Sequence, residues 1–376
     1  MTSPQSLRGL RIAHLIESDG PGGAERMVAS LATELQAAGA ANVVIAPDGG
    51  EGWLAKELDG SGVRMELFRL ERPVSPAFAR WLSGALRRHG VALAHSHEFT
   101  MGVYGAWAAR RAGVPHVVTM HGSRYYAGRW RRRIALRVAV GWAGATVAVS
   151  QTLARQLSGD LWVRPRRIAT IPNGARLAPA AGASLRDELR LSNGDQLAVA
   201  VGNLYAVKGH QHLVDALALL ASGFPRLHVA IAGRGELERP LRERARAAHV
   251  GDRVHLLGLR ADVGTVLAGA DVFVQPSLSE GLPLALIEAM LAARPIVATA
   301  VGEVPTALSE GRAGTLVPPG DPQALANALA ALLSNPGKAQ RLGAAAAQRA
   351  AQQYTLARMV ERYAALYASL LHLTNG

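Results

Sequence analysis

Short apolar runs alternate with amphipathic stretches along most of this 376-residue chain. Between the runs, apolar residues recur at the three- and four-residue spacing of a helix face. This alternation is typical of parallel strands joined by helices. The predicted strands lie near residues 11–16, 42–46, 92–96, 116–120, 145–149, 197–202, 228–232, 253–257, 271–275, 295–299 and 314–317.

The length of the chain favours two domains over a single hydrophobic core. The sequence Ile171-Pro172-Asn173-Gly174 and the Ala/Pro/Gly-rich residues up to Gly182 indicate a turn followed by a linker. We therefore expect one α/β domain over residues 1–178 and a second over 179–355. The alanine-rich stretch 323–351 has helical spacing and is predicted to form helices.

The composition is that of a folded protein, with 49% hydrophobic and 18% charged residues. Because the chain has no cysteine, disulfides and thiolate metal sites are excluded. The first residues lack the apolar core and cleavage site of a signal peptide, and no run reaches the roughly 18 apolar residues of a membrane span. We expect a cytoplasmic protein.

The net charge of +13 is unevenly distributed. Residues 99–159 contain nine arginines and no acidic residue, so this segment alone supplies +9. The whole chain has 38 arginines but only three lysines. Since such a bias also follows from genome composition, the arginine count says little about function, whereas a lysine within a motif is more informative.

A glycine-rich loop, Gly20-Pro21-Gly22-Gly23, separates the first predicted strand from a helix. Glycines at this place let the backbone approach a ligand closely, with a helix N-terminus behind it. A dinucleotide-binding loop is one alternative, with Asp48 as the ribose-binding acid. However, Glu25 stands where that fingerprint has its third glycine. A tight turn without ligand remains the other alternative.

The loop after the predicted strand 197–202 runs from Gly202 and Asn203 to Lys208 and Gly209. A lysine on such a loop can neutralise a diphosphate. A solvated lysine is the plainer alternative, but the scarcity of lysine and the two flanking glycines favour a ligand.

Three histidines lie at the ends of predicted strands, His95 and His97 at the end of the strand near 92–96 and His121 directly after the strand 116–120. His95 and His97 would share one face of an extended strand. Three histidines can make a zinc site, but no further spaced cluster supports one. We expect no metal, and the interpretation we prefer is a histidine that lines a sugar pocket, with His121 the best placed.

Two carboxylates, Glu280 and Glu288, lie eight residues apart around a predicted helix start at Pro283. Amides near Gly281 and Leu282 would be unpaired donors at a positive helix end, which favours a phosphate between the two carboxylates. Paired carboxylates also occur in glycosidases. Their setting in an α/β half, with Glu288 inside an apolar run, suits a nucleotide-sugar better.

Together these motifs closely resemble the family 4 glycosyltransferases, which are retaining enzymes of the GT-B fold. The resemblance extends over nearly the whole chain, and its motifs occur in a single order. They are Gly22-Gly23-Ala24-Glu25, His95-x-His97, His121-Gly122, Val147-Ala148-Val149-Ser150, Ile171-Pro172-Asn173-Gly174, Val201-Gly202-x-Leu204 with Lys208-Gly209, Pro276-Ser277 with Glu280-x7-Glu288, Gly302 with Pro305, and Gly314-x-Leu316-Val317-Pro318-Pro319-Gly320-Asp321.

The resemblance implies two Rossmann-like domains across a cleft, an acceptor-side first domain and a donor-binding second one. It also implies that a last helix, about 356–376, packs back on the first domain. Roles carried over residue by residue are the ribose hydroxyls for Glu288, the donor sugar for Glu280 and His121, the diphosphate for Lys208, Gly281, Leu282, Gly22 and Gly23, and the base for Gly233, Leu257 and Gly258. Asn203 is also placed among the donor-binding residues, and the catalytic residues would be Glu280, His121 and Lys208.

Two positions depart from the pattern of the family. Asn203 stands where many relatives carry an arginine, which removes one diphosphate contact, and Ala293-Arg294-Pro295 replaces a common Gly-x-Pro. The family's chemistry implies retaining transfer of a hexose from a UDP-sugar, or next a GDP-sugar, without a metal or other cofactor. The implied acceptor is a glycan or lipid-linked glycan of cell-envelope polysaccharide, lipopolysaccharide or glycolipid synthesis.

The basic segment Arg129–Arg137 places Arg129, Arg133 and Arg137 on one helical stripe beside Trp130 and Ile134. Such a helix suits an anionic membrane surface, which predicts a peripheral protein at the inner face of the cell membrane. A core-covering helix with solvated arginines is the alternative. We expect no nucleic acid partner because no recognisable module accompanies the charge. An NAD-dependent oxidoreductase and a basic membrane- or nucleic-acid-binding protein remain the alternative functions.

Overall fold

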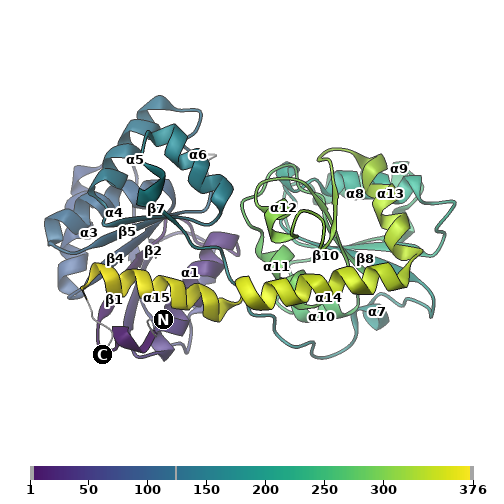
Figure 1. Ribbon diagram of the computed structural model, residues 1–376, viewed down its shortest axis with the longest axis horizontal. Helices are drawn as coiled ribbons and strands as arrows, with labels where there is room; N and C mark the ends of the chain where they lie inside the picture. The colour runs from purple at the N-terminus through teal and green to yellow at the C-terminus, as the bar shows by residue number, and fades with distance from the viewer. Residues whose placement is uncertain (1–3, 123–124, 373–376) are drawn as a thin grey trace. The chain divides into compact units, whose positions relative to one another are not determined.

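The computed structural model describes residues 4–122 and 125–372 and divides the chain into two compact units (Figure 1). Unit 1 comprises the residues up to Gly174 and those from Leu356 onward, and unit 2 comprises Ala175–Thr355. The predicted boundary at 178 thus falls just inside unit 2. Among the described residues, no helix combines the length and apolar character needed to cross a membrane.

Unit 1 is built on a seven-stranded sheet in which all neighbouring strands are parallel, in the order β3-β2-β1-β4-β5-β6-β7. Its strands are β1 (Arg11–Leu15), β2 (Ala41–Pro47), β3 (Arg64–Phe68), β4 (Leu93–His97), β5 (His116–Met120), β6 (Ala145–Ala148) and β7 (Ile168–Thr170). Its helices are η1 (Pro4–Leu7), α1 (Gly23–Ala37), α2 (Trp53–Glu57), α3 (Pro76–Arg88), α4 (Glu98–Ala112), α5 (Trp130–Trp142), α6 (Gln151–Leu161), η2 (Pro165–Arg167) and α15 (Leu356–Leu370).

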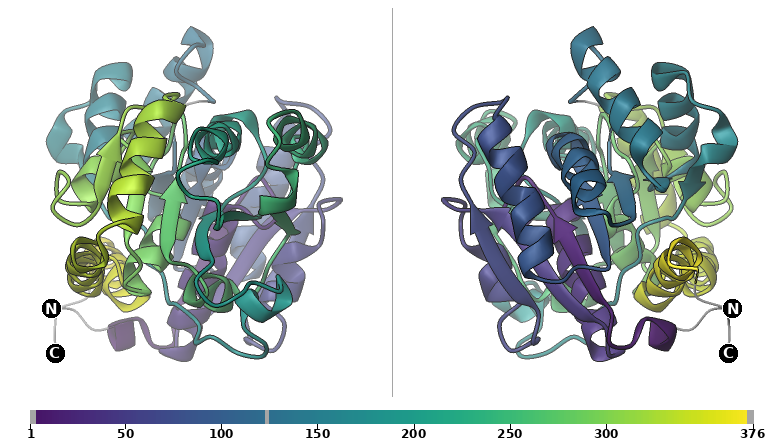
Figure 2. Two further views of the ribbon diagram at one scale, coloured as in Figure 1. Left: turned by 90° about the vertical axis from the view of Figure 1, so that its right-hand side faces the viewer. Right: turned by 90° about the vertical axis from the view of Figure 1, so that its left-hand side faces the viewer.

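Helices cover both faces of this sheet, as the right-hand view of Figure 2 shows. Neighbouring residues of one strand point to opposite faces, so Ile12 packs with α1 and α15, whereas Ala13 packs with α3 and α4. Helix α15 contributes Tyr363 and Tyr367, both fully buried, to the core on the α1 face. Helix α15 is therefore an integral part of the core of unit 1, whereas residues 373–376 of the predicted last helix lie outside the described residues.

Unit 2 has a six-stranded parallel sheet in the order β10-β9-β8-β11-β12-β13. Its strands are β8 (Gln196–Val201), β9 (Leu227–Ala232), β10 (Val254–Gly258), β11 (Val272–Gln275), β12 (Ile296–Thr299) and β13 (Thr315–Val317). Its helices are α7 (Leu185–Glu188), η3 (Ala206–Lys208), α8 (His210–Leu219), α9 (Glu238–Ala247), η4 (Gly251–Arg253), α10 (Val263–Ala268), α11 (Leu284–Leu291), α12 (Val304–Ala307), α13 (Pro322–Leu333) and α14 (Pro336–Gln353).

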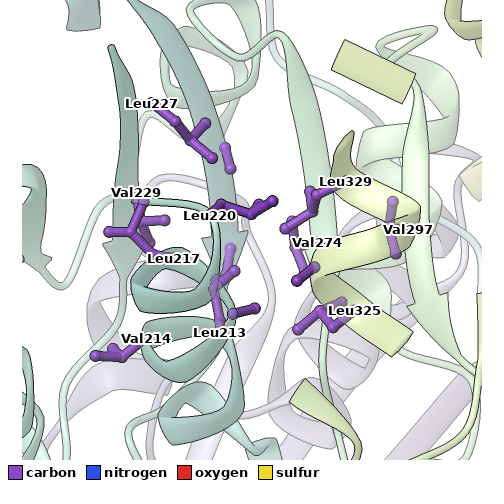
Figure 3. Packing of buried hydrophobic residues seen from close by; sticks show 14 of the residues in the cluster. Leu213, Val214, Leu217, Leu220, Leu227, Val229, Val274, Val297, Leu325 and Leu329 are labelled. Carbon is purple, nitrogen blue, oxygen red and sulfur yellow. The ribbon is translucent and has the colours of Figure 1, made fainter. Parts of the chain in front are cut away.

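The core on one face of this sheet lies between helices α8 and α13 and strands β9, β11 and β12 (Figure 3). Leu213 and Leu217 of α8, Val274 of β11 and Leu329 of α13 are fully buried there. On the other face, α11 and α14 pack over Phe273 and Ile296. Each unit therefore has three layers, with a parallel sheet between two layers of helices, as predicted for an α/β domain.

Every predicted strand is present, but β3 and β7 were not predicted. Both are edge strands. Strand β3 is half exposed and carries Arg64 and Glu66, and β7 has only three residues. An edge strand buries less of its surface than a central one, so neither segment has the continuous apolar run that identifies the others.

Candidate functional site

The predicted residues of the second half gather at one edge of the unit 2 sheet. Lys208 follows β8, Gly233 follows β9, Gly258 ends β10 and Glu280 follows β11. Because all these strands are parallel, their carboxyl ends meet at the same edge, where ligands of open α/β sheets bind.

The Glu280 carboxylate is the centre of this edge. Its Oε1 atom accepts hydrogen bonds from Lys208 Nζ (2.8 Å), Ser277 Oγ (2.6 Å) and Gln275 Nε2 (3.1 Å). The Glu280 side chain is only 8% exposed and that of Lys208 is 25% exposed, so the two charges compensate each other in a largely dry setting. This network holds both the carboxylate and the ammonium group in fixed positions.

Two glycines let the loops that carry this pair pack backbone against backbone. At Gly209 (φ +66°), an added Cβ would lie 2.1 Å from the carbonyl oxygen of Pro276, and at Gly302 (φ +55°) it would lie 1.9 Å from that of Glu280. Both positions therefore require glycine. The hydrogen bond from Leu278 N to Val207 O (2.8 Å) further joins the Lys208 loop to the Glu280 loop.

The loops after β8, β9 and β10 also lie together. Gly202 N donates to Ala232 O (2.9 Å), and Gly233 N donates to Gly258 O (2.7 Å). A Cβ on Gly233 would lie 2.0 Å from Gly202 O. The structure thus brings Gly233 and the Leu257–Gly258 end of β10, the residues predicted to bind the base, to one place, with Asn203 beside them.

Helix α11 begins at Leu284, one residue later than predicted, because Pro283 has an extended backbone (φ −67°, ψ 132°) and is the N-cap. Gly281 and Leu282 lie in the loop before it, and Gly281 O accepts a hydrogen bond from Glu303 N (3.0 Å). The Leu282 side chain is buried, so a ligand could meet only its backbone. Glu288 lies on the second turn and is half-buried.

Sequence reasoning assigned no role to three residues of this edge: Gln275, His210, and Ser277, which it named only as part of the Pro276-Ser277 motif. Gln275 and Ser277 are the additional donors to Glu280 described above. Buried His210 is placed to donate from Nε2 to Gly202 O (3.2 Å), and burial lowers its pKa to about 4, so it is neutral. Its position directly after Lys208-Gly209 was the available signal, but a histidine at a helix start has many other uses.

The glycine-rich loop of unit 1 is only partly open. Gly22 is the N-cap of α1, and a Cβ there would lie 2.3 Å from Glu25 Oε2. Gly22 thus makes room for a side chain of the protein, whereas the Cα of Gly23 faces open space. Asp48, the ribose-binding acid of the oxidoreductase alternative, forms an ion pair with Arg69 (2.6 Å), which weakens that alternative.

His14, His95 and His97 form a buried cluster on β1 and β4. Their ring nitrogens lie within 4.8 Å of one another. Within residues 4–122 and 125–372, this is the one group of histidine and acidic side chains spaced closely enough to hold a metal ion. However, His95 bonds Thr119 Oγ1 through Nε2 (2.7 Å) and Tyr367 through Nδ1 (2.5 Å), so both ring nitrogens are engaged. Burial lowers the pKa of all three rings. The cluster fits a neutral polar core better than a metal centre.

His121 and Glu98 lie at the carboxyl edge of the unit 1 sheet. His121 Nε2 lies 3.4 Å from His97 Nδ1, and burial lowers the His121 pKa to about 4. Glu98 has a left-handed backbone (φ +66°). Burial, reinforced by the Glu17 carboxylate, raises the pKa of Glu98 to about 8, so it is largely protonated at neutral pH. A strained backbone and a shifted pKa in one residue, as in Glu98, are typical of functional sites.

Two family models match the chain in the same order as the motifs. Residues 21–178 match the model described as Glycosyltransferase Family 4, and residues 183–349 match the model described as Glycosyl transferases group 1. Between them they include Gly22, His121, Lys208, Glu280 and Glu288.

Individual proteins show the same similarity. A D-inositol 3-phosphate glycosyltransferase of Thermobispora bispora is 30% identical over 337 residues, which cover 81% of this chain and 78% of that protein. An Escherichia coli UDP-Gal:alpha-D-GlcNAc-diphosphoundecaprenol alpha-1,3-galactosyltransferase is 31% identical over 229 residues, 56% of this chain and 58% of that protein. The chain therefore matches a little over half the length of the second relative.

The fold also matches solved structures. A crystal structure of Anabaena Alr3699/HepE in complex with UDP superposes with a TM-score of 0.83 at 22% identity, covering 96% of this chain and 100% of that chain. A glycosyltransferase from Rickettsia africae superposes with a TM-score of 0.81 at 18% identity over 97% of this chain and 99% of that chain. With both halves matched by family models and the GT-B fold by structure, the chain belongs to the family 4 glycosyltransferases.

Proposed function

We propose that this glycosyltransferase transfers a hexose from a UDP-sugar, with retention of configuration, to a glycan or lipid-linked acceptor of the cell envelope. The Lys208–Glu280 pair carries the proposal, because it sets a fixed cation beside a buried carboxylate at the ligand-binding edge of unit 2. The E. coli relative is named for UDP-Gal, and the Anabaena structure contains UDP, which favours uridine over guanosine.

In this proposal the donor is bound by groups of unit 2. The Lys208 ammonium group and the amides of Gly281 and Leu282 hold the diphosphate, and the second carboxylate oxygen of Glu280 accepts from a sugar hydroxyl. Glu288 holds the ribose hydroxyls, and the base lies against Gly233 and the end of β10. Gly22, Gly23 and His121 belong to unit 1, and their contacts with the donor stay predictions.

The mechanism follows from the charge that develops on the leaving group. As the bond from the sugar C1 to the diphosphate oxygen breaks, negative charge grows on the diphosphate. Lys208 and the amides before α11 stabilise that charge without a metal ion. The acceptor hydroxyl attacks C1 from the face that the diphosphate leaves, and its proton passes to a phosphate oxygen.

A membrane-bound acceptor is supported by the surface of α5. Trp130, Ile134, Val138 and Trp142 are 43–66% exposed, whereas the face that packs on the core carries Leu136 and Val140. The stripe that contains Trp130 and Ile134 is therefore exposed, although α5 also covers the core through Leu136 and Val140, as the alternative interpretation held. Exposed tryptophans beside arginines suit the interface of an anionic membrane. We include peripheral membrane binding in the proposed function.

A thermal-shift panel tests the donor. UDP-, GDP- and ADP-sugars and NAD are each added at the same concentration, and the largest rise in melting temperature is expected for a UDP-sugar. A ligand that binds only the folded state at 100 times its Kd stabilises it by about 2.7 kcal/mol, which is a readily measured shift. A shift with NAD and none with any nucleotide-sugar would refute the proposal.

A further inference from the structure

Unit 1 contains a pocket that the proposed donor site does not use. Its volume is about 330 Å³, and it is bounded by the segment after β3, the first half of α4, and the residues before and within the first turn of α5. These segments follow the carboxyl ends of β3, β4 and β5, so the pocket lies at the same edge of the sheet as Glu98 and His121. The side chains that matter for its chemistry are Glu71, Arg72, Phe99, Tyr104, Tyr125 and Arg132.

One wall of the pocket is fixed by Tyr104. Its hydroxyl accepts a hydrogen bond from Ser75 N (2.7 Å) and donates to Pro73 O (3.2 Å). Its ring meets Phe78 edge to face at a centroid distance of 4.8 Å. The segment that carries Arg72 is thereby tied to α4, and the wall is already formed without a ligand.

The opposite wall presents a held guanidinium group. Arg132 lies over the Tyr125 ring at 4.0 Å and over the Phe99 ring at 5.8 Å, and its NH1 donates to Tyr125 O (2.8 Å). Tyr126, next to Tyr125, is fully buried and anchors this wall in the core. Arg132 is therefore preorganised, and only one of its five N–H donors is needed for the bond to Tyr125.

The charges of the pocket favour an anion. Arg72 and Arg132 outnumber Glu71, and residues 99–159 contain no acidic side chain. Two guanidinium groups bind a phosphate through paired hydrogen bonds. Tyr125 is 48% exposed and Phe99 is half-buried, and both line the pocket. The parts of the two rings that Arg132 leaves uncovered can therefore contact the C–H face of a sugar ring, and Glu71 can accept from its hydroxyls.

We propose that this pocket binds the phosphate-bearing head group of the acceptor, a sugar linked through a phosphate or diphosphate ester. The inference rests on the proposed function and deepens it, because it assigns the acceptor to a chemical class. In this arrangement Arg72 and Arg132 hold the phosphate, and the aromatic rings hold the first sugar. A neutral glycan would leave both guanidinium groups without an anion to bind.

The test measures binding of three probes to the full-length protein by calorimetry: N-acetylglucosamine, N-acetylglucosamine 1-phosphate and the octyl diphosphate ester of N-acetylglucosamine. We expect the phosphorylated probes to bind at least tenfold more tightly than the neutral sugar. Tighter binding of the octyl ester than of the 1-phosphate assigns the site to a lipid-linked diphosphate, and equal binding assigns it to a free sugar phosphate.

Variants connect the binding to the pocket. Arg132→Gln and Arg72→Gln should each weaken binding of the phosphorylated probes about tenfold. Because Arg72 lies on an exposed segment, its substitution should not affect folding. Arg80→Gln, an exposed arginine on α3 outside the pocket, should bind them as the wild type does. UDP affinity, measured in parallel, should not change in any of the three variants.

The outcomes separate the two proposals. Wild-type affinity for the phosphorylated probes in both Arg72→Gln and Arg132→Gln, or equal affinity for neutral and phosphorylated probes, overturns the pocket assignment while UDP binding remains intact. Failure of the wild type to bind UDP at all contradicts the donor proposal instead.

Discussion

Mild acid should destabilise unit 1 because five histidines on or beside its central strands are uncharged in the folded state. They are His14, His95, His97, His116 and His121. Burial lowers the pKa to about 4, 3 and 4 for His14, His116 and His121, and well below 6.5 for the other two. The unfolded chain takes up protons near pH 6.5, so this part of the stability is present above pH 6.5 and is lost as the pH falls below it.

The magnitude follows from proton linkage. Between pH 7.5 and 5.5 each histidine that stays neutral only in the folded state lowers the free energy of unfolding by about 1.4 kcal/mol, or about 7 kcal/mol for the five together. Glu98 acts in the opposite direction: its pKa is raised to about 8, so the folded state takes up its proton and gains about 2.5 kcal/mol over the same interval. The net loss of about 4 kcal/mol is a large part of an ordinary domain stability of about 5–15 kcal/mol.

Hydrogen exchange measured by mass spectrometry gives the opening free energy of β1, β4 and β5 at the two pH values and constant ionic strength. The same measurement on His116→Gln, which keeps a polar group near Ser96, should show a pH dependence smaller by about 1.4 kcal/mol. A change below about 1 kcal/mol in the wild-type strands would refute the linkage argument, because it would mean that these histidines are protonated in the folded state or that the strands open before they titrate.

Four further predictions concern the site and the surface. Glu280→Gln should reduce turnover at least a hundredfold, with a melting temperature within a few degrees of wild type, because the amide keeps the volume but not the charge; wild-type activity would remove Glu280 from the site. Lys208→Ala should weaken UDP binding about tenfold in calorimetry through loss of a charge-assisted contact, and unchanged affinity would show that the ammonium group does not contact the diphosphate. Gly302→Ala should lower the free energy of unfolding by at least about 2 kcal/mol in urea, because the new Cβ would overlap Glu280 O; a neutral effect would mean that the loop adapts. Replacing Trp130 and Ile134 by serine should reduce co-sedimentation with vesicles containing phosphatidylglycerol, whereas equal binding of wild type and variant would exclude this stripe as the membrane contact.

The unfolded chain already contains most of what is needed to predict the fold. A central parallel strand is covered on both faces, so it needs a continuous apolar run, and each such run could be found from sequence. The order of the motifs along those runs was sufficient to indicate the family. Lys208 could be singled out because lysine is scarce, and Glu280 and Glu288 because they flank a predicted helix start, with Glu288 inside an apolar run. Gly302 was identified only as part of a motif of the family.

Other features depend on contacts between distant parts of the chain. Ser277 and Gln275 donate to the same oxygen as Lys208, although the sequence showed Ser277 only as part of a motif and Gln275 only as the end of a predicted strand, with no sign of this shared contact. One of the two hydrogen-bond partners of His95 is Tyr367, 272 positions away. The pocket of unit 1 combines side chains from three separate loop and helix segments.

Periodicity, glycine placement and composition are local properties, so the sequence by itself determined the two parallel sheets, the order of their strands along the chain and the loops that carry the candidate ligands. Which donors share an oxygen, which histidines become neutral and where Arg132 points are decided only when the sheets close and bury these groups. The physical reason is that hydrogen bonding and desolvation depend on neighbours in space. Those neighbours come from segments far apart in the sequence, and nothing in the sequence of either segment shows that they meet.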